Sequence, residues 1–266
     1  MKRIAWLTDI HLEFVGSEAA LAFIDQIAAS SPDIVLIGGD TGTARNLDFF
    51  LHAFDEKIRC PVFFVLGNHD FYHGSLGQIH SLAEEISESS RWLRWLTRQG
   101  IVEITSSTCL LGHDSWADGR LGNRSSSQVE INDYYLIEEF AGLSHPERYR
   151  KMANLGDQAA NHFRQWLPMA CADFRDILLL THVPPFREAC WHEGGISDDE
   201  FLPHFTCKAA GDTLRAIMHQ NPHRDLTVLC GHTHGHGEVD ILPNLHVKTG
   251  GAEYGQPKMQ EMMIVE

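Results

Sequence analysis

The stretch GNHDFYHG, residues 67–74, directly follows the apolar run CPVFFVL at 60–66. That run has the length and composition of a strand buried on both faces. A buried strand seldom ends on an amide, an imidazole and a carboxylate in succession, as Asn68, His69 and Asp70 do here. Whether these three residues belong to a functional site depends on which residues follow the other predicted strands.

Four further apolar runs of this kind occur, and each is followed by polar side chains that can bind a metal. The runs are RIAWLT at 3–8, DIVLIGG at 33–39, DILLLTH at 176–182 and LTVLCGH at 226–232. The side chains at their ends are Asp9, His11, Asp40, His182, His232 and His234. Because ligands of an open α/β sheet bind outside the carboxyl ends of its strands, we expect these residues and Asn68 to meet at one edge.

The spacing within these motifs fits a shared site. Asp9 and His11 are two residues apart, and so are His232 and His234. In an extended segment both members of each pair would face the same side. Glycines let the backbone turn sharply and bring the ligands close, and they stand at positions 38, 39, 67 and 231.

The number of donors indicates the kind of site. Seven oxygen and nitrogen donors exceed the three or four that one tetrahedral site needs. They suit two metal ions, about 3.5–4 Å apart, that share a bridging carboxylate and activate a water for an in-line displacement. Imidazole with carboxylate suits manganese, iron, zinc or nickel, so the metal stays open. With only Asp9 and Asp40 charged, the loaded centre stays positive and attracts a phosphate.

The order of the other segments predicts the fold class. Stretches with helical spacing lie at 17–30, 44–57, 75–89, 155–171 and 207–220. Strands that alternate with helices predict a layered α/β domain. Short runs at 238–243, 245–250 and 259–266 predict hairpins in a second sheet packed on the first, with 109–116 a further candidate. Since there is no repeat, low-complexity tract or linker, we expect one domain, residues 1–266.

Two insertions, 117–153 and 184–206, fit neither pattern. Long insertions in a compact domain are usually functional or disordered, and the aromatic residues here favour ordered loops that shape the substrate pocket. Several residues in or near the insertions allow two interpretations. His113 and Asp114 face the site or form a turn, Arg120 and Arg124 grip phosphate or face solvent, and Trp191 and His192 form a lid or pack locally.

The composition excludes several classes of partner. Apolar residues make up 43% of the chain and the formal net charge is -15, as in an ordinary soluble protein without a basic patch, which argues against nucleic acid. No apolar stretch approaches 18 residues, so no membrane span is expected. Six cysteines without a C-x-x-C pair indicate reduced thiols and a cytoplasmic protein. The oligomeric state is left open.

The ordered motifs D-x-H, G-D, G-N-H-D, a single H and G-H-x-H resemble those of the calcineurin-like metallophosphoesterases, and they span residues 9–234. The resemblance implies a four-layer α/β/β/α sandwich with two mixed sheets and the metal site at the C-terminal ends of the strands. It implies one metal on Asp9, His11, Asp40 and His234, and another on Asp40, Asn68, His182 and His232. It also implies attack by a metal-bridging hydroxide, with His69 contacting the phosphate or protonating the leaving oxygen.

Two departures separate the chain from the phosphoprotein phosphatases, which show G-D-x-x-D-R-G and G-N-H-E. Thr43 and Ala44 stand at the acid and arginine positions, and Asp70 follows His69. A Ser/Thr protein phosphatase is therefore not expected, and the pattern is closer to the cyclic-nucleotide phosphodiesterase-like branch. Asp70 becomes the candidate for the catalytic partner that orients His69.

The expected function is hydrolysis of small phosphate mono- or diesters. The alternative is a non-catalytic scaffold of the same fold that binds a protein partner, although such proteins lose ligands or the histidine of G-N-H, which this chain keeps. A metallo-β-lactamase-type site needs H-x-H-x-D-H, which residues 232–236 lack. A nuclease of the superfamily conflicts with the net charge of -15.

Overall fold

Apolar residues alternate between two environments along the central strands. In the computed structural model, which describes residues 1–266, Ile4 and Trp6 of β1 (Lys2–Leu7) join one buried cluster, and Ala5 and Leu7 join another. The first cluster also holds Leu178 and other side chains of a second sheet, whereas the other holds the helices. Because successive side chains of a strand point to opposite faces, each central strand packs on a sheet and on a helix layer.

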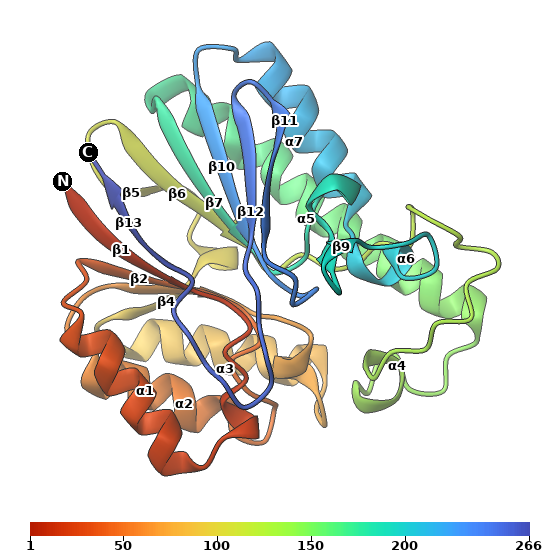
Figure 1. The fold of residues 1–266 in the computed structure, drawn as a ribbon, viewed down its shortest axis with the longest axis horizontal. Helices are drawn as coiled ribbons and strands as arrows, with labels where there is room; N and C mark the ends of the chain where they lie inside the picture. The colour runs from red at the N-terminus through yellow and green to blue at the C-terminus, as the bar shows by residue number, and fades with distance from the viewer.

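The first sheet has the order β13-β1-β2-β3-β4. β1 to β4 are parallel, and β13 is antiparallel to β1. The remaining strands are β2 (Ile34–Gly38), β3 (Val62–Val65), β4 (Leu93–Trp95) and β13 (Glu261–Val265). The helices α1 (Ser17–Ala29), α2 (Leu47–Lys57) and α3 (Leu76–Ser89) cover its outer face (Figure 1).

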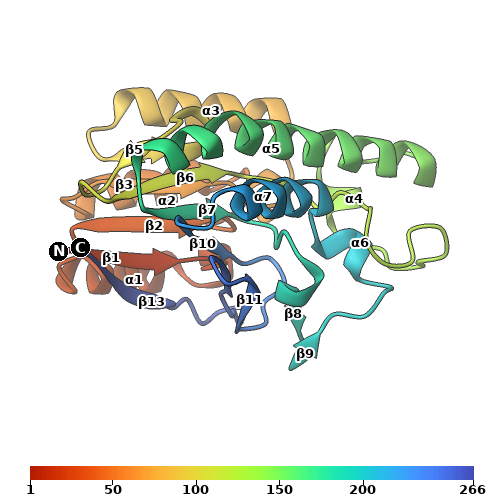
Figure 2. The same cartoon turned by 90° about the horizontal axis from the view of Figure 1, so that it is seen from above.

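The second sheet has the order β11-β12-β10-β7-β6-β5, with the four middle strands parallel and both edges antiparallel. Its strands are β5 (Val102–Glu103), β6 (Thr108–His113), β7 (Asp176–Thr181), β10 (Asp225–Cys230), β11 (Gly237–Leu242) and β12 (Leu245–Thr249). Helices α5 (His145–Asp173) and α7 (Lys208–Gln220) cover its outer face (Figure 2). The expected four-layer α/β/β/α sandwich with two mixed sheets is confirmed.

Two expectations about individual elements are wrong. The strand at 259–266 pairs with β1 in the first sheet, from Lys2↔Val265 to Trp6↔Glu261, and so fills an edge that β1 would otherwise leave open. Helix α5 begins at His145, inside the segment taken for an insertion. A capping box between Ser144 and Glu147, with proline in the first turn, starts the helix there.

Both insertions lie at the end of the molecule opposite to the two termini (Figures 1 and 2). The carboxyl ends of the parallel strands point toward this end. The first contains α4 (Asp133–Leu136), and the second contains the small strands β8 (Trp191–His192) and β9 (Gly195–Ile196) and helix α6 (Leu202–Phe205). All six cysteines are free, and all but Cys60 are buried.

No helix combines the length and the apolar character needed to cross a membrane.

Candidate metal centre

The loops after the strands hold an unusual backbone conformation. Of the seven residues expected to bind metal, five have left-handed φ angles: Asp9 (50°), His11 (44°), Asp40 (52°), His232 (69°) and His234 (62°). This conformation is uncommon outside glycine and costs of order 1–3 kcal/mol, so it persists where the surroundings enforce it, often at functional sites. The prediction that Asp9 and His11, and likewise His232 and His234, lie in extended segments is therefore wrong.

Two glycines allow the loops to approach closely. A Cβ atom on Gly231 would lie 1.8 Å from Oδ2 of Asp9, and one on Gly67 would lie 2.2 Å from Oδ1 of Asp40. Real Cβ atoms do not approach other atoms so closely, so a side chain at either position would displace a carboxylate. The glycines thus fix the separation of the strand ends from both sheets.

The first donor group consists of Asp9, His11, Asp40 and His234. One donor atom from each lies within 4.8 Å of the other three. Nε2 of His11 is 3.0 Å from Nε2 of His234 and 3.7 Å from Oδ2 of Asp40. Two imidazole nitrogens and two carboxylates therefore converge on one point, as ligands of a cation do.

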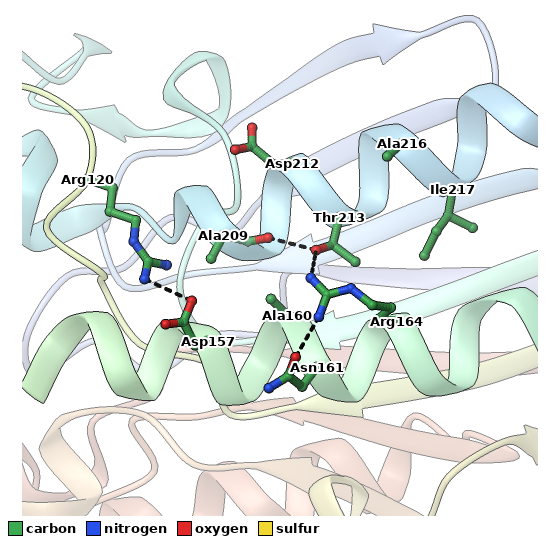
Figure 3. Close-up of a pocket in the computed structure, with 10 residues that line it drawn as sticks. All are labelled: Arg120, Asp157, Ala160, Asn161, Arg164, Ala209, Asp212, Thr213, Ala216 and Ile217. Carbon is green, nitrogen blue, oxygen red and sulfur yellow. Dashed lines mark hydrogen bonds and ion pairs between the residues drawn. The ribbon is translucent and has the colours of Figure 1, made fainter.

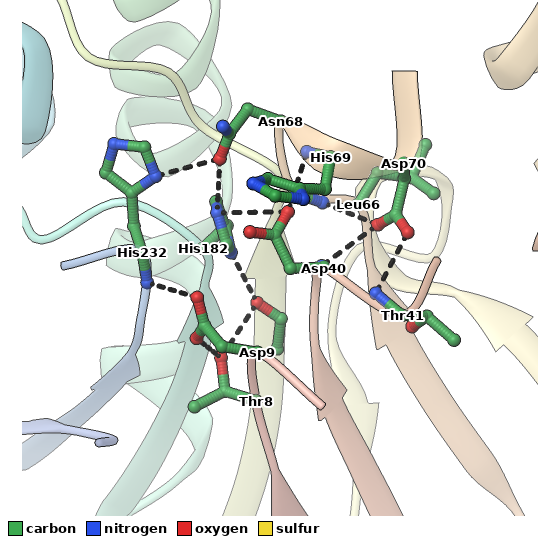
Figure 4. Close-up of polar contacts among 12 residues, drawn as sticks. Thr8, Asp9, Asp40, Thr41, Leu66, Asn68, His69, Asp70, His182 and His232 are labelled. Atoms are coloured by element: carbon green, nitrogen blue, oxygen red, sulfur yellow. Dashed lines mark hydrogen bonds and ion pairs between the residues drawn. The ribbon is translucent and has the colours of Figure 1, made fainter. Parts of the chain in front are cut away.

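The second donor group lies beside the first and centres on Asn68 (Figure 4). Its amide Oδ1 is 3.0 Å from Nε2 of His182 and 2.9 Å from Nδ1 of His232. Asp40 belongs to both groups through different oxygens, because its Oδ2 faces His11 and its Oδ1 lies 3.5 Å from Nε2 of His182. One carboxylate thus stands between two clusters of donors.

Contacts behind the donors fix their orientation. His182 donates from Nδ1 to the Gly38 carbonyl oxygen (2.9 Å), and His232 donates from Nε2 to the His204 carbonyl oxygen (3.0 Å). These bonds leave the lone pair of the other nitrogen facing Asn68. The Asn68 amide donates to Oδ1 of Asp133 at 2.8 Å, which turns its own Oδ1 toward the two rings. Metal-ligating histidines characteristically have such outer partners.

The protonation states also fit a cation site. Burial lowers the pKa of His232 to about 3 and that of His234 to about 4, so both rings are neutral, the form that binds metal. Burial, with the nearby charges of Asp9 and Asp70, raises the pKa of Asp40. No positively charged side chain compensates the carboxylate of Asp40 in this cluster. Oxygen and neutral nitrogen donors around an uncompensated carboxylate form a donor set that fits divalent cations.

His69 lies at the edge of the first group, and Glu13 orients it. The Nδ1 atom of His69 is 3.0 Å from Oε1 of Glu13, and the same oxygen lies 3.2 Å from Nδ1 of His11. Burial would raise the pKa of Glu13, but the hydrogen bonds from the two histidines outweigh it and lower the pKa to about 2. Glu13 was not among the residues predicted for the site, although its spacing of two from His11 places it beside the motif.

Asp70 does not contact the His69 ring, and the prediction that it orients His69 is wrong. Its carboxylate is fully buried and accepts backbone N–H bonds from Asp40 (3.1 Å), Thr41 (2.9 Å), Gly42 (3.0 Å) and Gly67 (2.8 Å). Both carboxylate oxygens are used by these bonds. Asp70 therefore holds the loop that carries Asp40 against the loop that carries Asn68.

Asp114 joins strand ends of the two sheets. Its Oδ1 accepts from the Leu66 backbone N–H (2.7 Å) and from the Trp95 indole (2.9 Å), while its carbonyl oxygen accepts from the His182 backbone N–H (3.2 Å). The position of Asp114 therefore couples the loops of Asn68 and His182. His113 turns away from the centre and accepts from the Ser115 N–H at 2.9 Å.

Both arginines singled out from the sequence lie away from the centre. Arg120 sits in a groove of about 660 Å³ between α5 and α7, where it pairs with Asp157 at 2.8 Å (Figure 3). It also pairs with Asp118 at 3.2 Å. The guanidinium of Arg124 lies 5.4 Å from the ring centre of Tyr149. Local carboxylates and a ring thus occupy both groups, and the phosphate-gripping interpretation is wrong.

A cavity of about 360 Å³ opens beside the donor groups. Residues of both insertions line it together with residues of the centre, namely Glu130, Ile131, Asn132 and Asp133 from the first and His192 and Phe205 from the second. Trp191 instead packs against Gly237, where a Cβ atom would lie 2.1 Å from its ring. Tyr254, in the connection between β12 and β13, also lines the cavity, and no sequence signal marked it or Asp133.

Comparison with known proteins places this geometry in context. The family described as calcineurin-like phosphoesterase matches residues 2–236. A Pseudoalteromonas sp. (strain SM9913) protein named as a probable cyclic nucleotide phosphodiesterase is 38% identical over 82 residues. That match covers 26% of this chain and 31% of the relative, so this chain spans about a third of the length of the relative that it matches.

Two solved structures share the fold. The phosphopantetheinyl hydrolase of Mycobacterium tuberculosis has a TM-score of 0.69 at 14% identity, covering 94% of this chain and 89% of that chain. A dimetal phosphatase of Danio rerio has a TM-score of 0.57 at 12% identity, covering 96% and 89%. At such identities the likeness shows a common architecture and leaves substrates open.

Proposed function

Because this chain belongs to the calcineurin-like phosphoesterase family, we propose that it is a metal-dependent hydrolase of phosphate mono- or diesters with two bound cations. Asp40 carries the proposal, because its two oxygens face different donor groups. Asp9, His11, Asp40 and His234 would hold one cation, and Asp40, Asn68, His182 and His232 would hold the other. Two such cations, when bound, supply an activated water and neutralise charge on the phosphoryl oxygens.

His69 is the proposed proton donor. Its Nδ1 faces Glu13 at 3.0 Å, so the proton on that nitrogen is held by the carboxylate. The Nε2 atom lies 3.5 Å from the Tyr254 hydroxyl oxygen, and in the proposed reaction it bonds a phosphoryl oxygen or passes its proton to the leaving oxygen. General acid catalysis of this kind contributes roughly 10²–10⁴-fold. The contact with Glu13 also holds the plane of the ring.

The choice between mono- and diesters rests on the relatives alone. The Pseudoalteromonas protein is named as a probable cyclic nucleotide phosphodiesterase, which favours a cyclic nucleotide diester, whereas the structures at 12–14% identity support only the fold. Both classes present one phosphate with a single leaving oxygen, which is what two cations and one proton donor can serve.

The test combines metal content with turnover. Purified protein is stripped with a chelator and reloaded with manganese, iron, zinc or nickel, and metal per chain is measured together with hydrolysis of p-nitrophenyl phosphate, bis(p-nitrophenyl) phosphate and 3′,5′-cyclic AMP. We expect two ions per chain and turnover of at least one ester. Two ions without turnover of any ester would favour the scaffold alternative, and fewer than two ions at saturation would contradict the shared carboxylate.

A further inference from the structure

Two large aromatic side chains beside the candidate centre are left half exposed. Phe14 is 52% exposed and Tyr254 is 50% exposed, and their ring centres lie 4.5 Å apart. Exposed apolar side chains scattered singly need no explanation, but these two rings are in contact with each other, and Tyr254 lines the cavity. The two rings form a small wall, and its position relative to the proposed proton donor decides what it can bind.

Tyr254 lies over the histidines of the centre. Its ring centre is 4.7 Å from that of His11 and 4.9 Å from that of His234, and its hydroxyl oxygen is 3.5 Å from Nε2 of His69. It lies beyond residues 2–236, the part of the chain that the family match covers. Phe14 ends the 3-10 turn Leu12–Phe14 that follows His11. Segments from the two ends of the chain thus meet beside His69.

The charge of the cavity limits the class of leaving group. No lysine or arginine lines the cavity, whereas Glu130 and Asp133 do. Arg148 approaches from behind, but its guanidinium is bound by both carboxylate oxygens of Glu130 at 2.8 and 2.9 Å. Apart from the proposed cations, the cavity therefore offers no lysine or arginine to a second anionic group. A substrate with further phosphates would meet carboxylates instead.

We propose, on the basis of the proposed function, that Tyr254 and Phe14 form a stacking wall for a leaving group that carries a planar aromatic ring, such as a phenol or a nucleoside, in an ester with a single phosphate. The leaving oxygen must reach Nε2 of His69, so the group attached to it passes the Tyr254 ring. Aromatic rings stack on one another with a gain in affinity of about tenfold. Tyr254 is therefore a specificity-determining residue.

The test uses three phosphonates that bind like esters and cannot be hydrolysed because they carry a P–C bond. Phenylphosphonate is planar, cyclohexylphosphonate has similar size without a π-face, and methylphosphonate lacks the ring. Dissociation constants are measured by titration calorimetry on the metal-loaded protein. We expect phenylphosphonate to bind about tenfold more tightly than either of the others.

Variants assign the preference to the wall. Tyr254→Leu is expected to bind the three phosphonates within about twofold of one another, and Tyr254→Phe to keep the phenyl preference, because it keeps the ring and loses only the hydroxyl. Phe49→Leu is the matched control, since Phe49 is 47% exposed on α2 and does not line the cavity. Metal content and circular dichroism confirm that each variant is folded and loaded.

The outcomes separate this inference from the proposed function. Equal affinity for phenyl- and cyclohexylphosphonate in the unaltered protein, or a phenyl preference that survives Tyr254→Leu, overturns the stacking wall. In either case, turnover of bis(p-nitrophenyl) phosphate by the same preparation leaves the proposed function standing. Tighter binding of 1,4-benzenediphosphonate than of phenylphosphonate overturns the restriction to one phosphate. No turnover and no binding of any phosphonate overturns both proposals.

Discussion

The two donor groups that share Asp40 differ in charge. The first contains two carboxylates, Asp9 and Asp40, with Glu13 bound behind His11. The second has Asp40 as its only carboxylate and is completed by an amide and two neutral imidazoles. Because the attraction between charges grows with each carboxylate, the first group should hold a divalent cation more tightly. The strand ends of the two sheets thus build two unequal sites.

The groups are alike in drawing on both sheets. In the first, His234 comes from the second sheet and the other three residues from loops of the first. In the second, His182 and His232 come from the second sheet, and Asp40 and Asn68 from the first. Asp114 and Gly231 couple these loops. Neither half of the molecule contains a complete group, so both form only when the sheets pack.

The change expected to have the largest effect removes the shared carboxylate. Asp40→Asn takes a charge from both groups at once, so we expect turnover to fall by about 10⁴-fold and metal content to drop below two ions per chain. Mass spectrometry of bound metal and steady-state kinetics measure the two effects. Asp157→Asn, in the groove between α5 and α7, is the control. Full activity with two bound ions in Asp40→Asn would contradict the proposal that Asp40 is shared by the two cations.

His69→Ala separates catalysis from metal binding. The variant should keep two ions, because His69 is in neither donor group, while kcat falls by about 10²–10³-fold. An ester with a good leaving group, such as p-nitrophenyl phosphate, should be less affected than an alkyl ester, since its oxygen needs no proton. An equal loss for both esters would contradict the role of His69 as proton donor.

Asn68→Ala and His11→Ala compare the groups directly. Each variant should retain one tightly bound ion, and turnover should fall by about a hundredfold in both. The ion left in Asn68→Ala occupies the group with two carboxylates and should dissociate more slowly on chelator challenge than the ion left in His11→Ala. The reverse order of dissociation would contradict the inequality of the two groups.

Glu13→Gln tests the support of the first group alone. Outer partners of metal-ligating histidines contribute roughly 10- to 100-fold in metal affinity, so one ion should bind more weakly by this factor while the other is unchanged. Competition with a fluorescent chelator resolves the two affinities. Equal weakening of both ions would show that Glu13 acts on the whole centre rather than through His11.

Asp114→Asn should have the smallest effect. The amide oxygen can still accept hydrogen bonds at the position of Oδ1, so we expect the free energy of unfolding to fall by about 1 kcal/mol and turnover to change by only a few-fold. Chemical denaturation of the metal-free protein measures the first effect. Loss of an ion in this variant would indicate that Asp114 is indispensable to the geometry of the second group.

The sequence determined which side chains are the candidate donors and which architecture carries them. Continuous apolar runs predict buried strands, and the polar residues after five of these runs lie close together in the structure, so the local pattern was sufficient to identify them. Helices α1, α2, α3 and α7 also lie where their spacing predicted them. These features depend on residues close together in the chain.

Only the tertiary structure decided how the donors are supported. Glu13, Asp133 and Tyr254 reach the centre from loops whose positions depend on how the two sheets pack. Asp70 likewise sits in the expected motif, but its carboxylate accepts hydrogen bonds from backbone amides of two loops instead of contacting His69. The left-handed backbone conformation of five donors could not be predicted from the sequence either. Contacts with distant segments hold such a strained conformation, and the residue that adopts it gives no local signal.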